Sequence, residues 1–482
     1  MTADLNERLM RGDLPDDPKA IATPVNEAAK RASAVRSIER APFSRGDHVE
    51  LADRLVAKLR AESPTTFSDG LFYQYAPDRG VFDAFTGAKL SQNVQRFAGT
   101  AVKGEKKPLR LKASDIAGTV KLASDQIADI DFFATARRGV AFASSFVEVT
   151  SEKITQHEHS PDHRARFAYD FGYLRDAEPA ALLEFFESSF RDDTDKQQKI
   201  DLLQEYLGIS LLGLATRYQR AIVTLGEGSN GKGVISSIAE KCMPPGSVCS
   251  IPPQDIGQEY RRHALAGKLL NIVSELPEAD ILDSESWKSV VAGDTMTGRE
   301  IRQAPFTFKP VAGHLYSANR LPGTTDQTHG FWRRIIVVPF NRVFEEHEQN
   351  PLLADQILAS DRAALVAWML RGAQRVLATG LFTIPESSKQ AKAAWQAKAD
   401  HVRAFAESTL TRLDDSARTG AGIRAEDLYQ VYRAWASRNG HRNPVASNTF
   451  GERMKLIGLG SKSDGFARRH PVELTEGTDE CS

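Results

Sequence analysis

A glycine-rich loop in the middle of the chain has the residue types and spacing that bind phosphate groups. Its sequence is Gly226-Glu-Gly-Ser-Asn-Gly-Lys-Gly233, and it lies between the apolar run 221–225 and the run 234–240. The first run predicts a buried strand and the second a helix. In such a strand–loop–helix, backbone N–H groups turn inward and the helix start adds partial positive charge. An ordinary glycine turn is the alternative, but the flanking runs favour a phosphate-binding loop.

The loop predicts a nucleotide-binding site, and a bound nucleotide is expected to bring a metal ion with it. Lys232 is expected to reach the β- and γ-phosphates of ATP as a point charge. The next position usually holds a Ser or Thr that binds Mg²⁺, but here it is Gly233, so Mg²⁺ must take its protein ligands elsewhere. The residues predicted to bind the nucleotide are Gly226, Glu227, Gly228, Ser229, Asn230, Gly231, Lys232, Gly233 and Val234.

Two later strands are predicted to bring polar groups to the same place. Glu275 ends the apolar run 268–275, and Asn319 ends the run 311–319. In a parallel sheet these ends face the nucleotide crevice. Glu275 is the predicted Mg²⁺ ligand and can orient the attacking water, with Glu278 and Asp280 as possible helpers. A neutral amide at Asn319 can position water or contact the γ-phosphate.

Arg333 and Arg334 directly precede another apolar run, 335–340. A guanidinium that reaches the nucleotide of a neighbouring subunit stabilises charge in the transition state and is called an arginine finger. For either arginine taken singly, a simple salt bridge is an equally good interpretation.

Basic residues in two other regions predict contacts with DNA phosphates. The stretch 288–302 carries Lys288, Arg299 and Arg302 around an expected turn. Near the C-terminus, basic residues outnumber acids between positions 453 and 469. The predicted DNA-binding residues there are Arg453, Lys455, Lys462, Arg468 and Arg469.

Composition places the chain among globular proteins with a neutral total charge. It has 482 residues, of which 41% are hydrophobic and 26% charged, and a formal net charge of −1. Any affinity for nucleic acid must therefore come from local basic surfaces. Three cysteines are too few for a disulfide framework. No apolar run approaches a membrane span and the N-terminus lacks a signal-peptide core, so we expect an intracellular protein with no membrane partner.

Periodicity and composition predict six consecutive regions. The first three are a flexible arm (1–45), a mixed α/β domain (46–193) with a helix over 47–61, and a helical collar (194–220) that opens with a capping box at 194–197. A nucleotide-binding core (221–345) follows, and then a region (346–410) with two long helices over 363–379 and 387–410. The last is a C-terminal domain (411–482) with helices over 425–439 and 447–457.

Taken in order, the motifs GEGSNGKG, NIVSE, AGDTMTGRE, LYSANRLP and WRRIIVVPF closely resemble those of superfamily 3 helicases. Within that superfamily the chain resembles the phage and plasmid primase–helicase family, which is related to the poxvirus primase–helicase. The resemblance covers roughly residues 130–482 and is strongest over 205–342. It implies an AAA+-like P-loop core with a parallel sheet, preceded by the α/β domain and collar and followed by a winged-helix domain.

The resemblance also implies a function and a set of residue roles. A homo-hexamer would hydrolyse ATP with Mg²⁺ at its subunit interfaces, move 3′→5′ along single-stranded DNA and unwind forked DNA. It would serve a phage, satellite or plasmid in the cytoplasm of a bacterial host, with primase, initiator or loader proteins as further partners. Lys232 would be the Walker A lysine, Glu275 the Walker B acid, Asn319 the sensor, and Arg333 or Arg334 the finger.

Four other functions stay open at this point. An origin-binding initiator or an antiphage ATPase switch would hydrolyse ATP without processive unwinding. A primase–helicase would need paired carboxylates, for which Asp129 and Asp131 are a weak match because no third acid follows. A small-molecule P-loop kinase is disfavoured because no lid or acceptor pocket is recognisable in the sequence.

Overall fold

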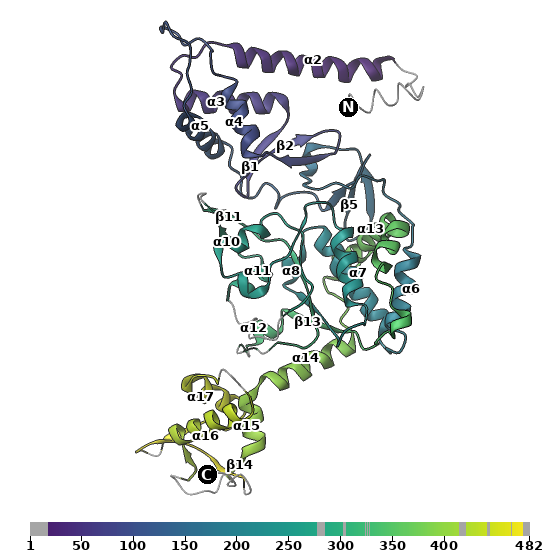
Figure 1. The fold of residues 1–482 in the computed structure, drawn as a ribbon, viewed down its shortest axis with the longest axis vertical. Helices are drawn as coiled ribbons and strands as arrows, with labels where there is room; N and C mark the ends of the chain where they lie inside the picture. The colour runs from purple at the N-terminus through teal and green to yellow at the C-terminus, as the bar shows by residue number, and fades with distance from the viewer. Residues whose placement is uncertain are drawn as a thin grey trace.

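The computed structural model describes residues 18–276, 285–301, 305–322, 324, 326, 328–413, 421–440, 444–463 and 465–475, with side chains from residue 28 onward. Figure 1 shows three successive regions along the longest axis. The N-terminal region lies at the top, the middle region with the parallel sheet lies below it, and the C-terminal region lies at the bottom, beyond helix α14. Among the described residues, no helix is both long and apolar enough to cross a membrane.

A parallel five-stranded sheet forms the centre of the middle region. Its strands stand in the order β13-β7-β12-β9-β8, so β7 lies between the two strands that come last in the chain. Residue Ile222 of β7 is in register with Leu315 of β12 on one side and Ile336 of β13 on the other. The strands are β7 (Ala221–Leu225), β8 (Val248–Cys249), β9 (Leu270–Val273), β12 (Gly313–Ala318) and β13 (Ile335–Pro339). The buried strands predicted around the glycine loop are confirmed.

The chain order of these strands creates a crevice at one edge of the sheet. From β7 the chain crosses to β8 at one side, and from β12 it crosses back over β7 to β13 at the other side. Ligands of open parallel sheets bind at such a reversal, outside the carboxyl ends of the strands. The loop after β7 therefore lies where the topology leaves room for a ligand.

Helices cover both faces of the sheet and enclose two apolar clusters. One cluster joins the sheet to α6 (Ala180–Ser189), α7 (Lys196–Leu211), α9 (Lys232–Cys242) and α13 (Leu353–Thr379). Helices α7 and α13 approach so closely that a side chain at Gly208 would clash with the backbone of Met369. The other cluster lies under α11 (Glu285–Ala292) and α14 (Glu386–Ala399), where Trp395 and Trp332 pack edge to face.

Smaller elements complete the middle region. Strands β10 (Met296–Gly298) and β11 (Phe306–Phe308) pair antiparallel on either side of the end of the basic stretch, where the sequence predicts a turn. The short helices are α8 (Ala215–Tyr218), α10 (Glu259–Arg262) and α12 (His329–Trp332), and the 3-10 turns are Pro253–Asp255, His263–Leu265 and Glu346–Glu348.

The N-terminal region has its own apolar cluster, which includes Phe43, Leu55 and Phe97. Its elements are α2 (Pro18–Arg40), α3 (His48–Glu62), β1 (Thr65–Ser68), β2 (Leu71–Ala76), β3 (Val81–Ala84), α4 (Gly87–Gln95) and α5 (Ala113–Gln126). A second antiparallel sheet follows, with β4 (Gly139–Ala141), β5 (Phe146–Val149), β6 (Ile154–His157) and a 3-10 turn at Pro161–His163. Several apolar residues of this sheet belong to the cluster of α7 and α13, so 139–157 packs onto the middle region.

The C-terminal region packs three helices around a small apolar cluster. Strands β15, β17 and β16 form an antiparallel sheet in that order, and β14 pairs with β18. The elements are α15 (His401–Thr409), β14 (Leu410–Arg412), β15 (Ile423–Arg424), α16 (Ala425–Arg438), α17 (Ser447–Leu456), β16 (Lys462–Ser463), β17 (Arg468–His470) and β18 (Val472–Leu474). The predicted helices over 425–439 and 447–457 are confirmed to within one residue.

Three sequence predictions about helices are wrong. Residues 18–40, predicted to belong to a flexible arm, form α2, whose Glu39 pairs with the buried Lys58 of α3 at 2.8 Å. The predicted capping box at 194–197 does not form, because α7 begins at Lys196 and the Asp195 carboxylate accepts the Ser387 N–H instead. The predicted long helix over 387–410 breaks at Asp400, whose side chain caps α15 by accepting the Arg403 N–H.

Candidate functional site

The glycine loop makes a tight, irregular turn between β7 and α9. Gly228, Ser229 and Gly231 all have positive φ angles of 116°, 44° and 89°. Glycine adopts such angles at little cost, and at Ser229 they are unusual for a residue with a Cβ atom. Gly231 directly precedes α9, whose first turn has unpaired backbone N–H groups. The local sequence therefore delivers a helix N-terminus to the crevice at the carboxyl ends of the strands.

Lys232 lies inside the loop with its side chain largely out of solvent. The residue is only 6% exposed, and its Nζ donates to Gly226 O at 2.5 Å and to Asn230 Oδ1 at 3.0 Å. Burial lowers the pKa of Lys232. Among the described residues no carboxylate pairs with this ammonium group, so its two acceptors are neutral oxygens. An anion that enters the loop would supply the missing negative charge.

The walls of the loop include residues that the sequence did not single out. A Cβ at Gly226 would clash with the Asn230 amide and lie 2.6 Å from Phe340 O. Phe344 N donates to Ser229 O at 2.7 Å, so the segment after β13 closes one side of the loop. Phe185 of α6 lies against Gly231, where an added Cβ would approach its ring to 3.0 Å. The sequence carries no local signal for these contacts, because they join the loop to segments far away in the chain.

A buried row of hydroxyl groups lies beneath the loop. Thr224 Oγ1 donates to Ser317 Oγ at 2.9 Å, and Ser317 Oγ lies 3.1 Å from Ser236 Oγ. This row ties β7, β12 and α9 together directly behind the loop. The hydroxyls hydrogen-bond one another, and all three residues are buried. They stabilise the base of the loop.

Glu275 and Asn319 lie at the carboxyl edge of the sheet, as predicted. Glu275 follows β9 by two residues and Asn319 directly follows β12, and both are exposed. Leu276 N donates to Ser317 O at 2.8 Å, which fixes the chain after Glu275 to the end of β12. The structure thus brings the loop, the acid and the amide to one edge. Glu278 and Asp280 lie outside the described residues.

Arg333 and Arg334 lie at the opposite, amino edge of the sheet. The main chain shows this directly, because Ala221 N, at the start of β7, donates to Arg334 O at 2.7 Å. The five residues of β7 separate this point from the glycine loop by about 16 Å of extended chain. Neither arginine side chain can therefore contact the loop of its own chain.

The two arginines differ in their surroundings. The Arg334 guanidinium donates to Gly330 O, and burial, together with the charge of Arg333, lowers the pKa of Arg334. Among the described residues the Arg333 side chain makes no hydrogen bond or ion pair. Burial and the charge of Arg333 also lower the pKa of Arg220, so this end of the amino edge concentrates positive charge.

The predicted DNA-binding residues of the middle region differ in the contacts that they make. Lys288 Nζ donates to Asp326 Oδ2 at 2.8 Å. Burial alone would raise the pKa of Asp326, but hydrogen bonds from Lys288 and Thr328 hold it below its ordinary value. Lys288 is thus an ion-pair partner of Asp326, and its contact with DNA stays a prediction. Arg299 lies at the hairpin, 4.0 Å from Glu259 and above the Tyr260 ring, whereas Arg302 lies outside the described residues.

The C-terminal region corrects the prediction for Arg453. This residue is only 6% exposed and faces the core of the region, so it is not available at the surface. Lys455, Lys462 and Arg468 are exposed. Arg469 is partly buried and donates to Gly422 O at 3.1 Å. Three of the predicted cations therefore stay exposed on α17 and on the β16–β17 hairpin.

Comparison with known proteins relates this chain to viral proteins. A family of unknown function (DUF5906) matches residues 224–334. "Putative helicase L207/L206" of Acanthamoeba polyphaga mimivirus is 27% identical over 177 residues, or 33% of this chain and 18% of that protein. "Putative helicase 121R" of Invertebrate iridescent virus 3 is 23% identical over 301 residues, or 55% of this chain and 31% of that protein. The chain thus spans less than a third of either relative.

Two solved structures resemble the chain over most of its length. The A form apo structure of the NrS-1 C-terminal region is 14% identical and has a TM-score of 0.43, covering 84% of this chain and 86% of that chain. A second apo structure of the same region (305–718) has the same TM-score and covers 86% of this chain and 87% of that chain. At this distance the resemblance concerns the general fold and adds nothing about the site.

The arrangement at the carboxyl edge can bind and polarise a phosphate chain. Lys232 and the first N–H groups of α9 supply positive charge, Glu275 supplies a carboxylate for a metal or a water, and Asn319 supplies a neutral amide. Phe340 and Phe185 back the loop. Neither Arg333 nor Arg334 of the same chain reaches this edge.

Proposed function

We propose that this chain is an ATP-dependent replicative DNA helicase of a phage, satellite or plasmid. The observation that carries the proposal is Lys232, a buried ammonium group held on two neutral oxygens at the start of α9. Such a cation has a strong requirement for an anion, and the loop around it suits the phosphates of ATP. The similarity to proteins named helicases supports DNA as the other substrate.

Mg²⁺ is expected to accompany ATP, and the residues present fit it in part. Gly233 offers no ligand, and the hydroxyls of Thr224, Ser236 and Ser317 are occupied with one another beneath the loop. Glu275 is an exposed carboxylate at the same edge. We therefore propose that Glu275 would hold Mg²⁺, directly or through water, and that the ion would supply positive charge to the phosphates.

The ring assembly that we propose follows from the separation of the two edges. The amino edge carries Arg333, which is partly exposed and has no side-chain partner among the described residues, whereas Arg334 is tied to Gly330 O. If copies of the chain pack head to tail, the amino edge of one copy can meet the carboxyl edge of the next. In that arrangement Arg333 acts as the finger, and a closed homo-hexamer gives every interface one complete site.

The C-terminal region is the proposed DNA-binding domain. Three helices precede the β16–β17 hairpin in the order of a winged helix, and Lys455, Lys462 and Arg468 give it an exposed basic surface. Such a surface suits contacts with DNA phosphates.

The purified protein provides the test. ATP hydrolysis should rise when single-stranded DNA is added, and the protein should displace a strand from a forked duplex only with ATP and Mg²⁺. Hydrolysis without displacement on any fork would indicate an initiator or a switch in place of a helicase. The absence of ATP hydrolysis with every DNA would contradict the proposal altogether.

A further inference from the structure

A cavity lies at the junction of the N-terminal and middle regions, far from the glycine loop. Its volume is about 130 Å³, and its walls come from both regions: Phe133, Arg164 and Arg166 from one side, and Leu211, Lys309 and Val311 from the other. Leu269, which also lines it, directly precedes β9. The cavity therefore opens near the amino edge of the sheet, so it is separate from the ATP site.

Among the described residues, four cations line this cavity, and three of them have a carboxylate partner. Lys309 pairs with Asp131 at 2.8 Å, Arg137 with Glu148 at 3.5 Å, and Arg166 with Asp69. The fourth is Arg164. Its Nη1 donates to Phe132 O at 3.1 Å and to Thr135 Oγ1 at 2.5 Å, both neutral oxygens. Among the described residues, no carboxylate balances the charge of Arg164.

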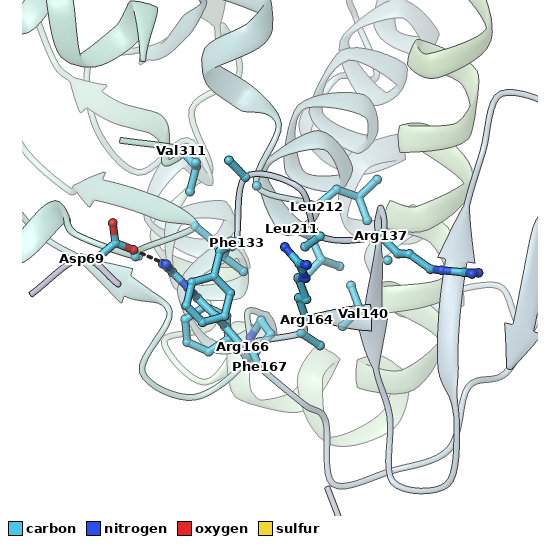
Figure 2. A pocket seen from close by; sticks show the side chains of 18 of the residues that line it. Asp69, Phe133, Arg137, Val140, Arg164, Arg166, Phe167, Leu211, Leu212 and Val311 are labelled. Carbon is cyan, nitrogen blue, oxygen red and sulfur yellow. Dashed lines mark hydrogen bonds and ion pairs between the residues drawn. The ribbon is translucent and has the colours of Figure 1, made fainter. Parts of the chain in front are cut away.

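The backbone at Arg164 is held in an unusual conformation. Arg164 has φ 52° and ψ 36°, the left-handed region that residues with a Cβ seldom adopt. Its N–H donates to Pro161 O at 3.1 Å, and its guanidinium lies 4.6 Å from the centre of the Phe132 ring. Figure 2 shows the Arg164 side chain within the cavity, between Phe133 and Leu211, whereas the Arg137 side chain extends away from it. A strained residue with a fixed, unbalanced charge is typical of a binding site.

Arg166 offers a further donor at the same junction. Its Nε is buried and has no hydrogen-bond partner among the described residues. Its guanidinium lies 3.7 Å from the centre of the Phe133 ring, which holds it in place. An oxyanion in the cavity could accept from N–H groups that have no protein acceptor.

We infer that this cavity binds one phosphate group of a single-stranded DNA backbone, with Arg164 as its principal ligand. The cavity of about 130 Å³ has room for a phosphate group, and Arg164 supplies the positive charge that such a group requires. Lys309 and Val311 closely follow β11 of the hairpin that carries Arg299. The hairpin and the cavity are thus only a few residues apart along the chain, so a DNA strand that contacts the hairpin can also contact the cavity. The inference that the bound phosphate belongs to DNA rests on the proposed function, whereas the phosphate site itself rests on the cavity.

The test is binding of a fluorescein-labelled oligothymidylate to the full chain, measured over a series of salt concentrations. Arg164→Gln should weaken binding by about tenfold, as expected for one lost charge-assisted contact. It should also lower the slope of log affinity against log salt by about 0.7, the value for one single-strand phosphate. Arg164→Lys, which keeps the charge, should retain most of the affinity. Arg137→Gln is the matched control, because it removes a cation of the same cavity whose guanidinium extends away, and it should change affinity less than about twofold.

Two comparisons keep the outcomes distinct. Equal effects of Arg164→Gln and Arg137→Gln at equal thermal stability would overturn the cavity site. A second comparison uses Lys232→Ala, which removes the ATP-site lysine, with and without Arg164→Gln. If Arg164→Gln weakens the binding of inorganic phosphate but leaves DNA affinity unchanged, the cavity binds free phosphate and not DNA. ATP hydrolysis without DNA is measured in parallel. If it is intact in both cavity variants, a negative DNA result contradicts the cavity alone and leaves the proposed ATPase standing.

Discussion

The two edges of the parallel sheet differ in what they offer to a nucleotide. The carboxyl edge has the glycine loop, a buried Lys232 and an exposed acid, but neither Arg333 nor Arg334 of the same chain reaches it. The amino edge has Arg333, Arg334 and Arg220 close together but lies far from the glycine loop. About 16 Å of strand separates them. In the proposed function, each edge supplies one half of a phosphoryl-transfer site.

This division gives the proposed assembly a physical reason. Transition-state charge on a transferred phosphoryl group is stabilised best when a guanidinium joins the lysine and the metal. A single copy of this chain cannot provide that guanidinium from Arg333, whereas a neighbouring copy can. A site divided in this way should respond differently to substitutions at the two edges.

The largest effect is expected at the carboxyl edge. Lys232→Ala should abolish ATP hydrolysis and weaken ATP binding, because it removes the ammonium group that the loop encloses. The folded state should survive, because burial without a counter-ion makes this cation costly to the fold. Steady-state hydrolysis and nucleotide affinity measure the change. Lys241→Ala on the same helix, where Lys241 is exposed and pairs with Asp355, is the control and should leave hydrolysis intact.

A smaller loss is expected at the amino edge. Arg333→Ala should reduce hydrolysis by at least about a hundredfold while ATP affinity stays within a few-fold, because a finger acts mainly in the transition state. Arg334→Ala should act mainly on stability, since it removes the donor to Gly330 O. Nucleotide affinity, turnover and the unfolding midpoint separate these effects. If Arg334→Ala lost turnover at full stability while Arg333→Ala kept it, the finger would be Arg334.

The smallest effect concerns the stability of the sheet itself, near the amino edge. Burial lowers the pKa of His314 to about 3, and its Nδ1 lies 3.0 Å from Tyr316 Oη. In the unfolded chain the imidazole takes a proton near pH ~6.5. Between these values the unfolded state binds more protons, so stability falls as pH falls. We expect a loss of about 2 kcal/mol between about pH 7.5 and about pH 5.

Denaturant unfolding at the two pH values measures this effect. His314→Gln should lose that share of the pH dependence, whereas His329→Gln, at the exposed start of α12, should keep it. The same pH dependence in both variants would show that His314 is not the source.

Local patterns in the sequence predicted the carboxyl edge well. Apolar runs followed by Gly226, Glu275 and Asn319 indicated three strands and their ends, because fully buried parallel strands read as continuous apolar segments. The same reasoning placed Arg333 and Arg334 before a strand. The loop and the arginines then fall on opposite edges because parallel strands all run in the same direction.

Local sequence patterns could not predict contacts between segments that are far apart in the chain. The wall formed by Phe340 depends on the strand order, and the pairing of Lys288 with Asp326 depends on how α11 lies against a later loop. Arg453 was misjudged because charge composition does not say which side of α17 faces its neighbours. Asp400 ended a helix that periodicity alone would continue, since its side chain caps the next one.

The most direct test of the divided site mixes two inactive proteins. Lys232→Ala subunits keep Arg333, and Arg333→Ala subunits keep Lys232. In rings assembled at random from equal amounts of the two proteins, about one interface in four combines an intact Lys232 with an intact Arg333. The account predicts that mixing restores ATP hydrolysis to as much as about a quarter of the wild-type rate. No recovery at any ratio, with mixed oligomers shown to form, would contradict a site shared between copies.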